Sequence, residues 1–544
     1  MSEDTPASGA RFDFIVIGSG FGGSVSALRL TEKGYRVLVV EEGKRWRAED
    51  FPKSNWHLRK AFWLPRLGCF GIQRLDWLGD VLVLGGAGVG GGSLVYANTL
   101  VVPPAEVFAQ GWPVADAGAR LGPCFATVRR MLGVTVPPAT WPAEEHLRDF
   151  ARSLGREAQF SAPEVGVLFG SKPGEPLADP YFDGRGPARS TCRLCGGCMV
   201  GCRYDAKNTL DRNYLYLAEK LGARILPETR AVGIAEDGAG GYWVDTRRSL
   251  AWAGRSPGRL RAENVVVAAG ALGTVGLLLA CREAGTLTKL SPTLGQFART
   301  NSEIICGARS RSAAVDHSQG IAIASDLQAD PDTHIQIVRY PSGSDVMGLL
   351  GTLAAPGSRR LPRVLRWLYQ CGRHPVDFLR NLWPLGWARR TVVVLVMQSL
   401  DNALTLVRRR RWLGRNLRSR RAHGAPPIPT YLPIANQAAE HIARSMGGFA
   451  LNAINEVVLG VPITAHILGG ARMAESPAQG VVDGACRVFG HPGLWVVDGA
   501  VIPTNLGANP SLTIAAVAEH AMSLIPTKDN AKQPASVPGT LHLK

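Results

Sequence analysis

The stretch RFDFIVIGSGFGGSVSALRL, residues 11–30, determines the fold class of this chain. An apolar run ending at Ile17 enters a glycine-rich turn, and a helix-like pattern follows; a second apolar run ends at Glu41. This strand–turn–helix–strand order is typical of a Rossmann dinucleotide site, in which glycines let a pyrophosphate approach the helix and the acid binds a ribose. The alternative is a close-packed turn without ligand, and the motif does not separate FAD from NAD. The residues predicted to hold the dinucleotide are Gly18, Gly20, Gly22, Gly23 and Glu41.

The segment 466–522, at the other end of the chain, combines a base, an amide and a helix start. It begins with HILGGARM, contains the pair Asp498-Gly499 after an apolar strand, and reaches Asn509-Pro510 before a helical pattern. Asparagine is a favoured N-cap, and proline suits the first helical turn. The free N–H groups of such a helix start stabilise an anion. Taken alone, His466 is more readily explained as a structural histidine beside a glycine turn, and Asn509 as an N-cap.

Two further glycine-rich stretches lie between these ends. LGGAGVGGGS (84–93) and the end of ENVVVAAGALGT (263–274) are suited to backbone approach to a flat ligand or a diphosphate. Helical patterns occupy 117–132, 143–154 and 434–447, and longer alternating strands begin near residue 300. We therefore expect a second, sheet-based domain inserted between parts of the first.

Four cysteines, Cys192, Cys195, Cys198 and Cys202, have the spacing of a bacterial ferredoxin run, with Arg203 where proline is usual. An iron–sulfur cluster, a zinc ion and reduced thiols all remain open for them. The first residues, MSEDTPASGA, contain no basic region and no apolar run, which predicts no signal peptide. No segment reaches the roughly 18 apolar residues of a spanning helix. We expect a cytoplasmic protein with reduced cysteines.

The net charge of +17 is concentrated between Arg359 and Arg421, where sixteen arginines accompany only two acids. Tryptophans and tyrosine, including Trp383 and Trp412, lie among them. Arginine with interfacial aromatics favours a surface that rests on anionic lipid, peripherally on the inner face of the membrane. A solvated arginine-rich face is the equal alternative. Nucleic acid is not expected, because no recognised binding module is present.

Together these motifs resemble the glucose–methanol–choline (GMC) FAD oxidoreductases, and within them the bacterial cholesterol-oxidase branch. The resembling stretches run in order through the chain: 18–30, 86–98, 195–210, 265–274, 398–405 and 466–522. The resemblance implies an α/β (α+β) fold with a Rossmann-like FAD-binding domain split along the chain and a substrate domain on a mainly antiparallel sheet. The expected parts are 11–125, 190–300 and 456–525 for FAD, 126–189 for a lid region, 301–455 for substrate, with the basic segment 359–421, and 526–544 for a disordered tail.

The resemblance also assigns residues to the cofactor. No histidine lies in the 86–98 loop, so the FAD is expected to be bound non-covalently. Beyond the fingerprint glycines and Glu41, the cofactor residues implied are Phe21, Gly86, Gly91, Gly92, Tyr96, Asn98, Val232, Gly270, Asp498, Gly499, Asn509, Pro510 and Ser511.

In this context His466 becomes the expected acceptor of the hydroxyl proton and Asn509 the residue that holds the hydroxyl oxygen. One position departs from the family. Cholesterol oxidases use a glutamate base in the substrate domain, also for moving the steroid double bond, whereas THIQIVRY places Gln336 near that position. Glutamine cannot take a proton, so isomerisation is in doubt. Glu303 and Glu456 are candidate replacements.

The sequence therefore predicts FAD-dependent oxidation of a bulky lipophilic alcohol, a 3β-hydroxysteroid above others, with dioxygen as acceptor. The first alternative is an FAD dehydrogenase that passes electrons through an iron–sulfur cluster to a protein or quinone. Another is a redox-neutral FAD-containing lyase on the same fold. A non-catalytic basic binder of membrane or nucleic acid is a fourth.

Overall fold

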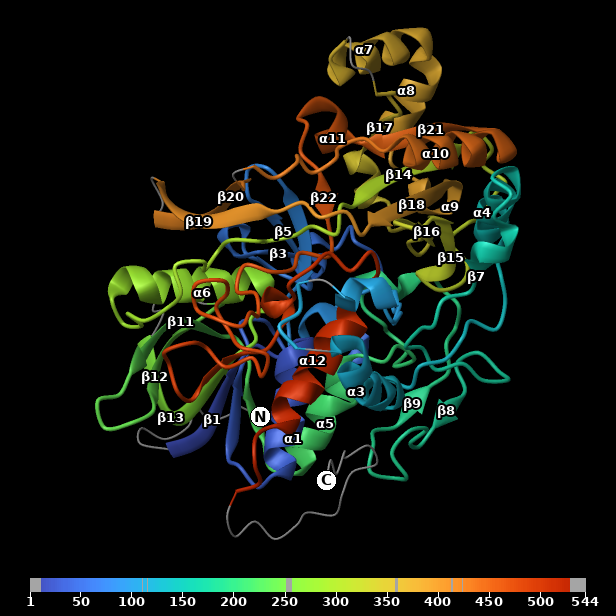
Figure 1. Cartoon of the computed structure of the whole chain (residues 1–544). Helices are drawn as coiled ribbons and strands as arrows, with labels where there is room; N and C mark the ends of the chain where they lie inside the picture. Colours follow the sequence, from blue (N-terminus) through green and yellow to red (C-terminus); the bar gives the residue numbers. More distant parts are fainter. Residues whose placement is uncertain are drawn as a thin grey trace.

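The computed structural model describes residues 11–528 apart from 110, 115, 251–256, 358–360, 412–413 and 423. Arg359 and Trp412 of the basic segment, and residues 529–544 of the tail, lie outside this part of the chain. Within it the predicted fold class is confirmed: parallel and antiparallel sheets pack with helices into a mixed α/β molecule (Figure 1).

The first sheet is built around β1 (Arg11–Ile17), whose residues from Phe12 onward are all buried. Parallel strands covered on both faces read as continuous apolar runs, as this one does. The order is β10-β2-β1-β13-β12-β11, and β23 runs parallel to the second half of β13. Its other strands are β2 (Val37–Val40), β10 (Arg224–Leu226), β11 (Thr229–Glu236), β12 (Tyr242–Arg248), β13 (Pro257–Val267) and β23 (Leu494–Val496).

Helices from both ends of the chain pack together beside this sheet (Figure 1). α1 begins directly after the glycine turn and contacts α12 and α5, and α12 also contacts α3. The bounds are α1 (Phe21–Glu32), α3 (Ala117–Met131), α5 (Tyr214–Lys220), α6 (Gly270–Ala284) and α12 (Ser511–Ser523).

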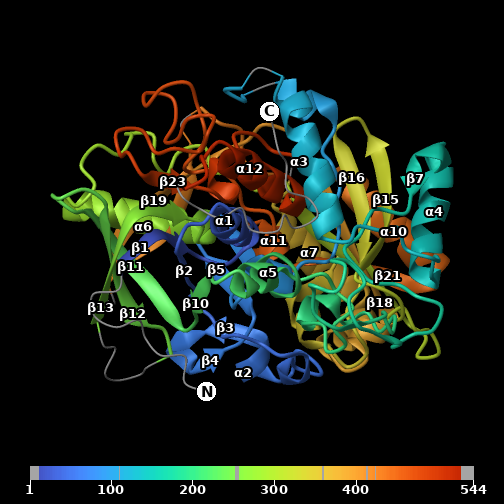
Figure 2. The ribbon, with the colours of Figure 1, turned by 90° about the horizontal axis from the view of Figure 1, so that it is seen from below.

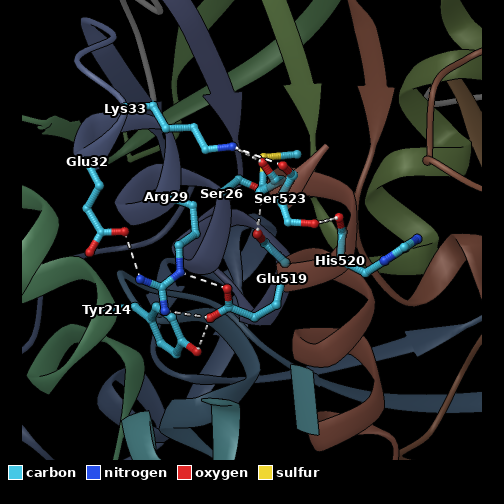
Figure 3. Close-up of polar contacts among 10 residues, drawn as sticks. Ser26, Arg29, Glu32, Lys33, Tyr214, Glu519, His520 and Ser523 are labelled. Atoms are coloured by element: carbon cyan, nitrogen blue, oxygen red, sulfur yellow. Dashed lines mark hydrogen bonds and ion pairs between the residues drawn. The ribbon is translucent and has the colours of Figure 1, made fainter. Parts of the chain in front are cut away.

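A buried ion pair fastens the two chain ends. Arg29 of α1 donates from Nε and Nη2 to the carboxylate of Glu519 of α12, at 2.7 and 2.9 Å. The Tyr214 hydroxyl donates to the same carboxylate at 2.7 Å, and Glu32 accepts from Arg29 Nη1 (Figure 3). Burial opposes the charge on Arg29, but the two carboxylates outweigh it and raise its pKa well above the ordinary value. These contacts hold the N-terminal and C-terminal parts of the chain in fixed positions relative to each other.

The second sheet has the order β17-β21-β14-β18-β16-β15-β7, and all its pairs are antiparallel. Helices α10 and α4 cover one face (Figure 2). Alternate residues, such as Ile305 and Leu395, point to the other face, toward the first sheet. The bounds are β7 (Phe160–Ser161), β14 (Ile304–Ser310), β15 (Ile323–Asp330), β16 (Thr333–Val338), β17 (Gly351–Leu353), β18 (Thr391–Gln398), β21 (Gly448–Ala453), α4 (Pro142–Ser153) and α10 (Pro433–Ser445).

A third, smaller sheet of order β22-β6-β5-β3-β4 joins the two larger ones. Its strands are β3 (Phe62–Leu64), β4 (Cys69–Phe70), β5 (Gln73–Trp77), β6 (Leu82–Gly86) and β22 (Ile463–Thr464). Short pieces complete the chain: α2 (Leu58–Ala61), α11 (Ile454–Val458), β8 (Pro176–Leu177), β9 (Arg189–Ser190), and the 3₁₀ turns η1 (Ala48–Asp50), η2 (Pro65–Leu67), η3 (Gly91–Leu94), η4 (Ala105–Ala109), η5 (Glu157–Gln159), η6 (Gly197–Val200), η7 (Leu210–Arg212), η8 (Val346–Leu350) and η9 (Gly499–Val501).

The basic segment does not form one surface. Its first part folds into α7 (Arg363–Arg373), α8 (Pro375–Leu382) and α9 (Trp387–Arg390), and its middle is β18, a buried central strand. Its last part is the hairpin of β19 (Leu404–Arg411) and β20 (Gly414–Arg421), which lies beside α6, well away from α7 and α8 (Figure 1). Across the described residues, no helix combines the length and apolar character needed to cross a bilayer.

Candidate active site

A cavity of about 400 Å³ lies where the three sheets meet. The first sheet contributes the turn Gly20–Gly22 and the 268–273 loop, and the second contributes Ile305, Val393 and Leu395. The third contributes Phe62 and the strand 83–86. The lining is mainly apolar, and its few polar groups come from segments far apart in the sequence. Such a cavity is the default ligand site of a mixed α/β protein.

The glycine turn brings the start of α1 to one end of this cavity. Gly18 has a φ of +99°, and a Cβ there would lie 2.3 Å from the carbonyl oxygen of Ala268. A Cβ on Gly22 would lie 1.6 Å from the carbonyl oxygen of Val497. Glycine is therefore required at both positions for the turn to pack against β13 and β23. The consequence is that free N–H groups at the start of α1 face the cavity.

Asp498 lies at the same end, after β23. It accepts hydrogen bonds from the Thr274 hydroxyl at 2.5 Å and from the Ala500 backbone N–H at 2.7 Å. Burial raises the pKa of Asp498 to about 6, against the effect of these hydrogen bonds. Thr274, which no sequence pattern singled out, thus fixes the carboxyl group of a cavity residue.

His466 reaches the cavity from the strand end of β22. Its backbone N–H donates to the Thr464 hydroxyl at 2.9 Å, which sets the direction of the chain. The ring Nδ1 is in close ion-pair contact with Oε1 of Glu303. The other carboxylate oxygen of Glu303 accepts from the Ala465 N–H at 2.6 Å, and the Glu303 side chain is fully buried. A carboxylate behind Nδ1 leaves Nε2 as the ring nitrogen available to a ligand.

Asn509 also lines the cavity and lies just before α12. Its Oδ1 accepts from Gln336 Nε2 at 3.0 Å, and the same Nε2 donates to Asp326 at 2.9 Å. The other oxygen of Asp326 pairs with His334 Nδ1 at 3.0 Å. Burial would lower the pKa of His334, but the hydrogen bond and charge of Asp326 raise it above its ordinary value. Since the Asn509 oxygen is occupied, its amide N–H₂ is the group left for a ligand.

Comparison with known proteins places this geometry in a family. Residues 416–518 match the model for GMC oxidoreductase, and residues 16–49 match an NAD(P)-binding Rossmann-like domain. A cholesterol oxidase of Acinetobacter baumannii is 43% identical, with 96% of each chain covered. A cholesterol oxidase of Mycobacterium tuberculosis is 47% identical, covering 95% of this chain and 91% of that one. The chain belongs to the GMC oxidoreductase family.

The solved structure of pyridoxine 4-oxidase from Mesorbium loti has the same fold, with a TM-score of 0.58 over 94% of this chain and 98% of that one, at 15% identity. The predicted family is confirmed, and the chain is an FAD-dependent oxidoreductase.

The residues present fit an FAD. Gly20 and Gly270 both line the cavity, and a Cβ on either would meet no protein atom within 4 Å. Those side chains would fill the cavity itself, so glycine leaves room there for a ligand. Of the predicted residues, those that line the cavity are Gly20, Phe21, Gly22, Gly86, Gly92, Tyr96, Gly270, His466, Asp498, Gly499, Asn509, Pro510 and Ser511.

Other predicted residues stand back from the cavity: Gly18, Gly23, Glu41, Gly91, Asn98, Val232, Glu303 and Gln336. Glu41 accepts from the N–H and hydroxyl of Ser19 at 3.1 and 2.7 Å and from the Gly43 N–H at 2.8 Å. It is thus bonded to the fingerprint turn itself. Val232 sits where the β11–β12 register shifts, between Ala231 and Gly233, which leaves its backbone unpaired with β12.

The four clustered cysteines line a second, small cavity of about 30 Å³ together with Lys207. Lys207 Nζ donates to the carbonyl oxygens of Cys198 and Leu94 at 2.8 and 3.1 Å. Burial lowers the pKa of Lys207 to about 7 and raises that of Cys198 to about 11. Of the alternatives left open for these cysteines, an iron–sulfur cluster finds no support in this geometry, because the described residues contain no group of three or more His, Cys, Asp or Glu arranged to hold a metal ion.

The sequence did not identify Asp326 or Thr274, and it offered Glu303 only as a candidate replacement for the missing base. Asp326 lies directly opposite Gln336 in the β15–β16 pair, so only the strand register reveals it. A signal for Thr274 existed, since it ends the glycine-rich stretch 263–274 that was expected near the cofactor. Glu456, the other candidate acid, does not line the cavity, and burial raises its pKa to about 8.

Proposed function

We propose that this GMC oxidoreductase oxidises the hydroxyl group of a 3β-hydroxysteroid, with dioxygen as the electron acceptor. The observation that carries the proposal is the meeting of His466 and Asn509, the two residues expected to handle the hydroxyl group, in one apolar cavity. A rigid steroid is a large apolar body with one hydroxyl, which suits an apolar cavity with few polar groups. The two cholesterol oxidases that are 43% and 47% identical support this substrate class.

The side chains divide the work on the hydroxyl group. FAD, when bound, accepts the carbinol hydride. His466 Nε2 takes the hydroxyl proton, and Glu303, in contact with Nδ1, holds the ring in its orientation. The Asn509 amide donates to the hydroxyl oxygen and fixes its position. The N-terminal N–H groups of α12, at Ser511, stabilise negative charge in the cavity.

Oxidation is proposed to proceed without movement of the steroid double bond. That movement needs a base beside the ring. Gln336, whose Nε2 donates to both Asn509 and Asp326, has no carboxylate that could take the proton. The expected product of a sterol with a 5,6 double bond is the 3-ketone with the double bond in its original place. Product analysis by mass spectrometry and ultraviolet absorbance checks this, because a conjugated enone absorbs strongly and an unconjugated one does not.

The cofactor is proposed to be dissociable, with the backbone of Val232 at the adenine and with Gly91 and Asn98 along the chain that leads to the ring. Acid precipitation should release all of the flavin. The sterol is proposed to come from an anionic membrane surface on the cytoplasmic side, since a sterol is scarcely soluble in water.

The deciding experiment is anaerobic mixing with cholesterol, a 3α-hydroxysteroid and a long-chain primary alcohol. We expect rapid bleaching of the flavin by cholesterol and slow or no bleaching by the others. Equal bleaching by the primary alcohol would contradict the steroid assignment. Flavin that stays oxidised while substrate is consumed would instead identify a redox-neutral lyase.

An FAD dehydrogenase is the second candidate, and it would need a metal cluster at the four cysteines that line the small cavity. Lys207 connects that cavity to the active site, because its Nζ lies 4.6 Å from the centre of the Tyr96 ring, which lines the larger cavity. Iron and sulfide analysis of protein purified without oxygen separates the two. Stoichiometric iron with slow peroxide formation would favour the dehydrogenase over the oxidase.

A further inference from the structure

Helices α7 and α8 expose apolar side chains to solvent, whereas the amphipathic helices of a globular protein turn theirs toward the core. Nine large apolar side chains in and beside them are between 50% and 64% exposed, and we call them the α7–α8 patch. They are Leu361, Leu365, Leu368, Tyr369, Val376, Leu379, Leu382, Trp383 and Leu385. Monomeric soluble proteins rarely expose so many contiguous apolar groups without a function.

Two arginines of α7, Arg363 and Arg366, face the body of the protein. Arg363 donates to the carbonyl oxygens of Ala355 and Thr430, and Arg366 donates to those of Pro356 and Gly357. No residue of α7 is buried. The rest of its attachment is small: Cys371 packs against Leu353, Phe449 and Leu451, and Trp367 Nε1 donates to the Thr352 hydroxyl at 2.8 Å. Leu365, Leu368 and Tyr369, at helical spacing, point outward.

The same arrangement holds for α8. Its fully buried residues are polar, Asp377 and Asn381, and Phe378 packs beside them, partly buried, against the second sheet. Asp377 accepts from Arg311 at 2.7 and 3.0 Å, and Asn381 donates to the carbonyl oxygen of Gly351 at 2.8 Å. Leu379 and Trp383 are meanwhile exposed. Two consecutive helices with this arrangement form a surface built for an apolar medium.

The charge around the patch indicates which kind of apolar surface it would contact. Residues 361–390 contain six arginines and one acid, Asp377, which is buried and bonded to Arg311 and Arg380. Arg373, Arg380 and Arg389 are exposed beside the apolar side chains. Each cation near an anionic bilayer adds about 1 kcal/mol to binding. A second copy of the chain fits poorly, because a self-complementary interface would bring the same arginines together.

The patch adjoins the substrate cavity. Asn381 of α8 is bonded to Gly351, and Gly351, Leu350 and Met347 line the cavity. Leu349, between them, is 55% exposed. Figure 1 shows α7 and α8 standing out from the molecule, beyond the second sheet and away from the helices that join the two chain ends. A molecule seated on a bilayer through this patch would therefore hold its cavity over the lipid.

We propose that the α7–α8 patch is a membrane anchor that inserts into the interface of a bilayer rich in anionic phospholipid and brings the cavity to its sterol. Membrane docking through this patch supplies the partner and the docking element for the proposed function. It rests on the proposed function only in taking the substrate to be a sterol. Insertion of Leu, Trp and Tyr to the level of the headgroups, with arginine at the phosphates, is the known physics of interfacial helices.

The test compares the FAD-bound enzyme with the quadruple variant Leu365→Ser, Leu368→Ser, Leu379→Ser, Trp383→Ser. All four side chains are exposed, so the substitutions remove no core packing. The matched control carries Val136→Ser and Leu524→Ser, which are similarly exposed elsewhere. Flotation with sterol-free vesicles of phosphatidylcholine and phosphatidylglycerol measures binding without turnover.

We expect the parent and the control to float with the mixed vesicles, and the quadruple variant to bind about tenfold or more weakly. Arg373→Glu should weaken binding less, and binding of the parent should fall with added salt. Equal flotation of parent and quadruple variant would overturn the anchor. So would sedimentation that shows a dimer lost in the quadruple variant while no vesicles are bound, because that assigns the patch to a second copy.

A second readout separates the anchor from the proposed function. The ratio of sterol turnover in vesicles to turnover in detergent micelles should fall about tenfold in the quadruple variant and stay constant in the control. If no variant oxidises sterol in either form while flotation still depends on the patch, the anchor stands and the substrate assignment fails. A constant ratio in the quadruple variant would contradict the role of the anchor in delivery.

Discussion

Two polar arms, each a short series of hydrogen-bonded side chains, reach the cavity, and both contain a histidine paired with a carboxylate. In the first arm the histidine, His466, faces the cavity and Glu303 lies behind it. In the second arm the order is reversed: Asn509 faces the cavity, and Gln336, Asp326 and then His334 follow behind.

The difference shows how the same pair can serve two purposes. A carboxylate behind a histidine orients the ring and leaves the other ring nitrogen free for a ligand. A histidine behind a carboxylate instead fixes the position of that carboxylate, so that Asp326 can hold the Gln336 amide with its N–H₂ toward Asn509. The first arm moves a proton, and the second positions a donor. Substitutions in the two arms should therefore differ in size and in kind.

The largest effect is expected from His466→Ala, which removes the base. Flavin reduction by sterol should slow by about 10²–10⁴-fold, the usual contribution of a positioned base. Bound FAD should remain, because His466 is one of many cavity residues. Rapid mixing without oxygen measures the rate, and flavin absorbance after gel filtration measures occupancy. Flavin reduction at the wild-type rate in His466→Ala would show that His466 is not the base.

Glu303→Gln is expected to be the next largest. The amide keeps the size of the side chain and its contact with the Ala465 N–H, but loses the charge behind His466 Nδ1. Outer partners of this kind are worth about 10–100-fold. The loss should appear in kcat with KM little changed, and the pH profile of kcat should change its shape. A change confined to KM would indicate that Glu303 only shapes the cavity.

The sequence predicted local features well. The helices expected at 117–132, 143–154 and 434–447 occur as α3, α4 and α10 within a few residues, because periodicity and caps are properties of neighbouring residues. The fingerprint turn was equally readable, since Gly18 and Gly22 are required by contacts with their own sheet.

The rest depended on pairings that no local pattern encodes. Asp326 meets Gln336 through strand register, and Gln336 meets Asn509 across 173 residues. The basic segment was expected to form one surface, yet the continuous apolar run in 391–398 makes its middle a buried strand and separates α7–α8 from the β19–β20 hairpin. Charge and composition alone did not reveal that division.

Gln336→Glu is expected to have a moderate effect and tests the second arm directly. A carboxylate there would face the oxygens of both Asn509 and Asp326, and it could no longer donate to either unless protonated. We expect turnover to fall about tenfold as the Asn509 amide loses its orientation. Gln336→Met, which removes the donor without adding charge, is the control. The same product assay shows whether the new carboxylate moves the double bond. Unchanged turnover in both variants would show that Gln336 does not orient the Asn509 amide.

The smallest effect is expected from His334→Gln, and it should depend on pH. Because Asp326 raises the pKa of His334 on folding, the stabilisation is complete below the ordinary value of 6.5 and is lost as the pH rises through the higher folded value. The variant should therefore unfold at lower denaturant than the parent in acid, by a few tenths to about 1 kcal/mol, and approach it in alkali. Glutamine keeps a donor for Asp326, so the charge alone is tested. Urea unfolding of both proteins, saturated with FAD, measures the difference at each pH. A difference that does not vary with pH would show that His334 acts as a neutral hydrogen-bond donor and that Asp326 needs no cation behind it.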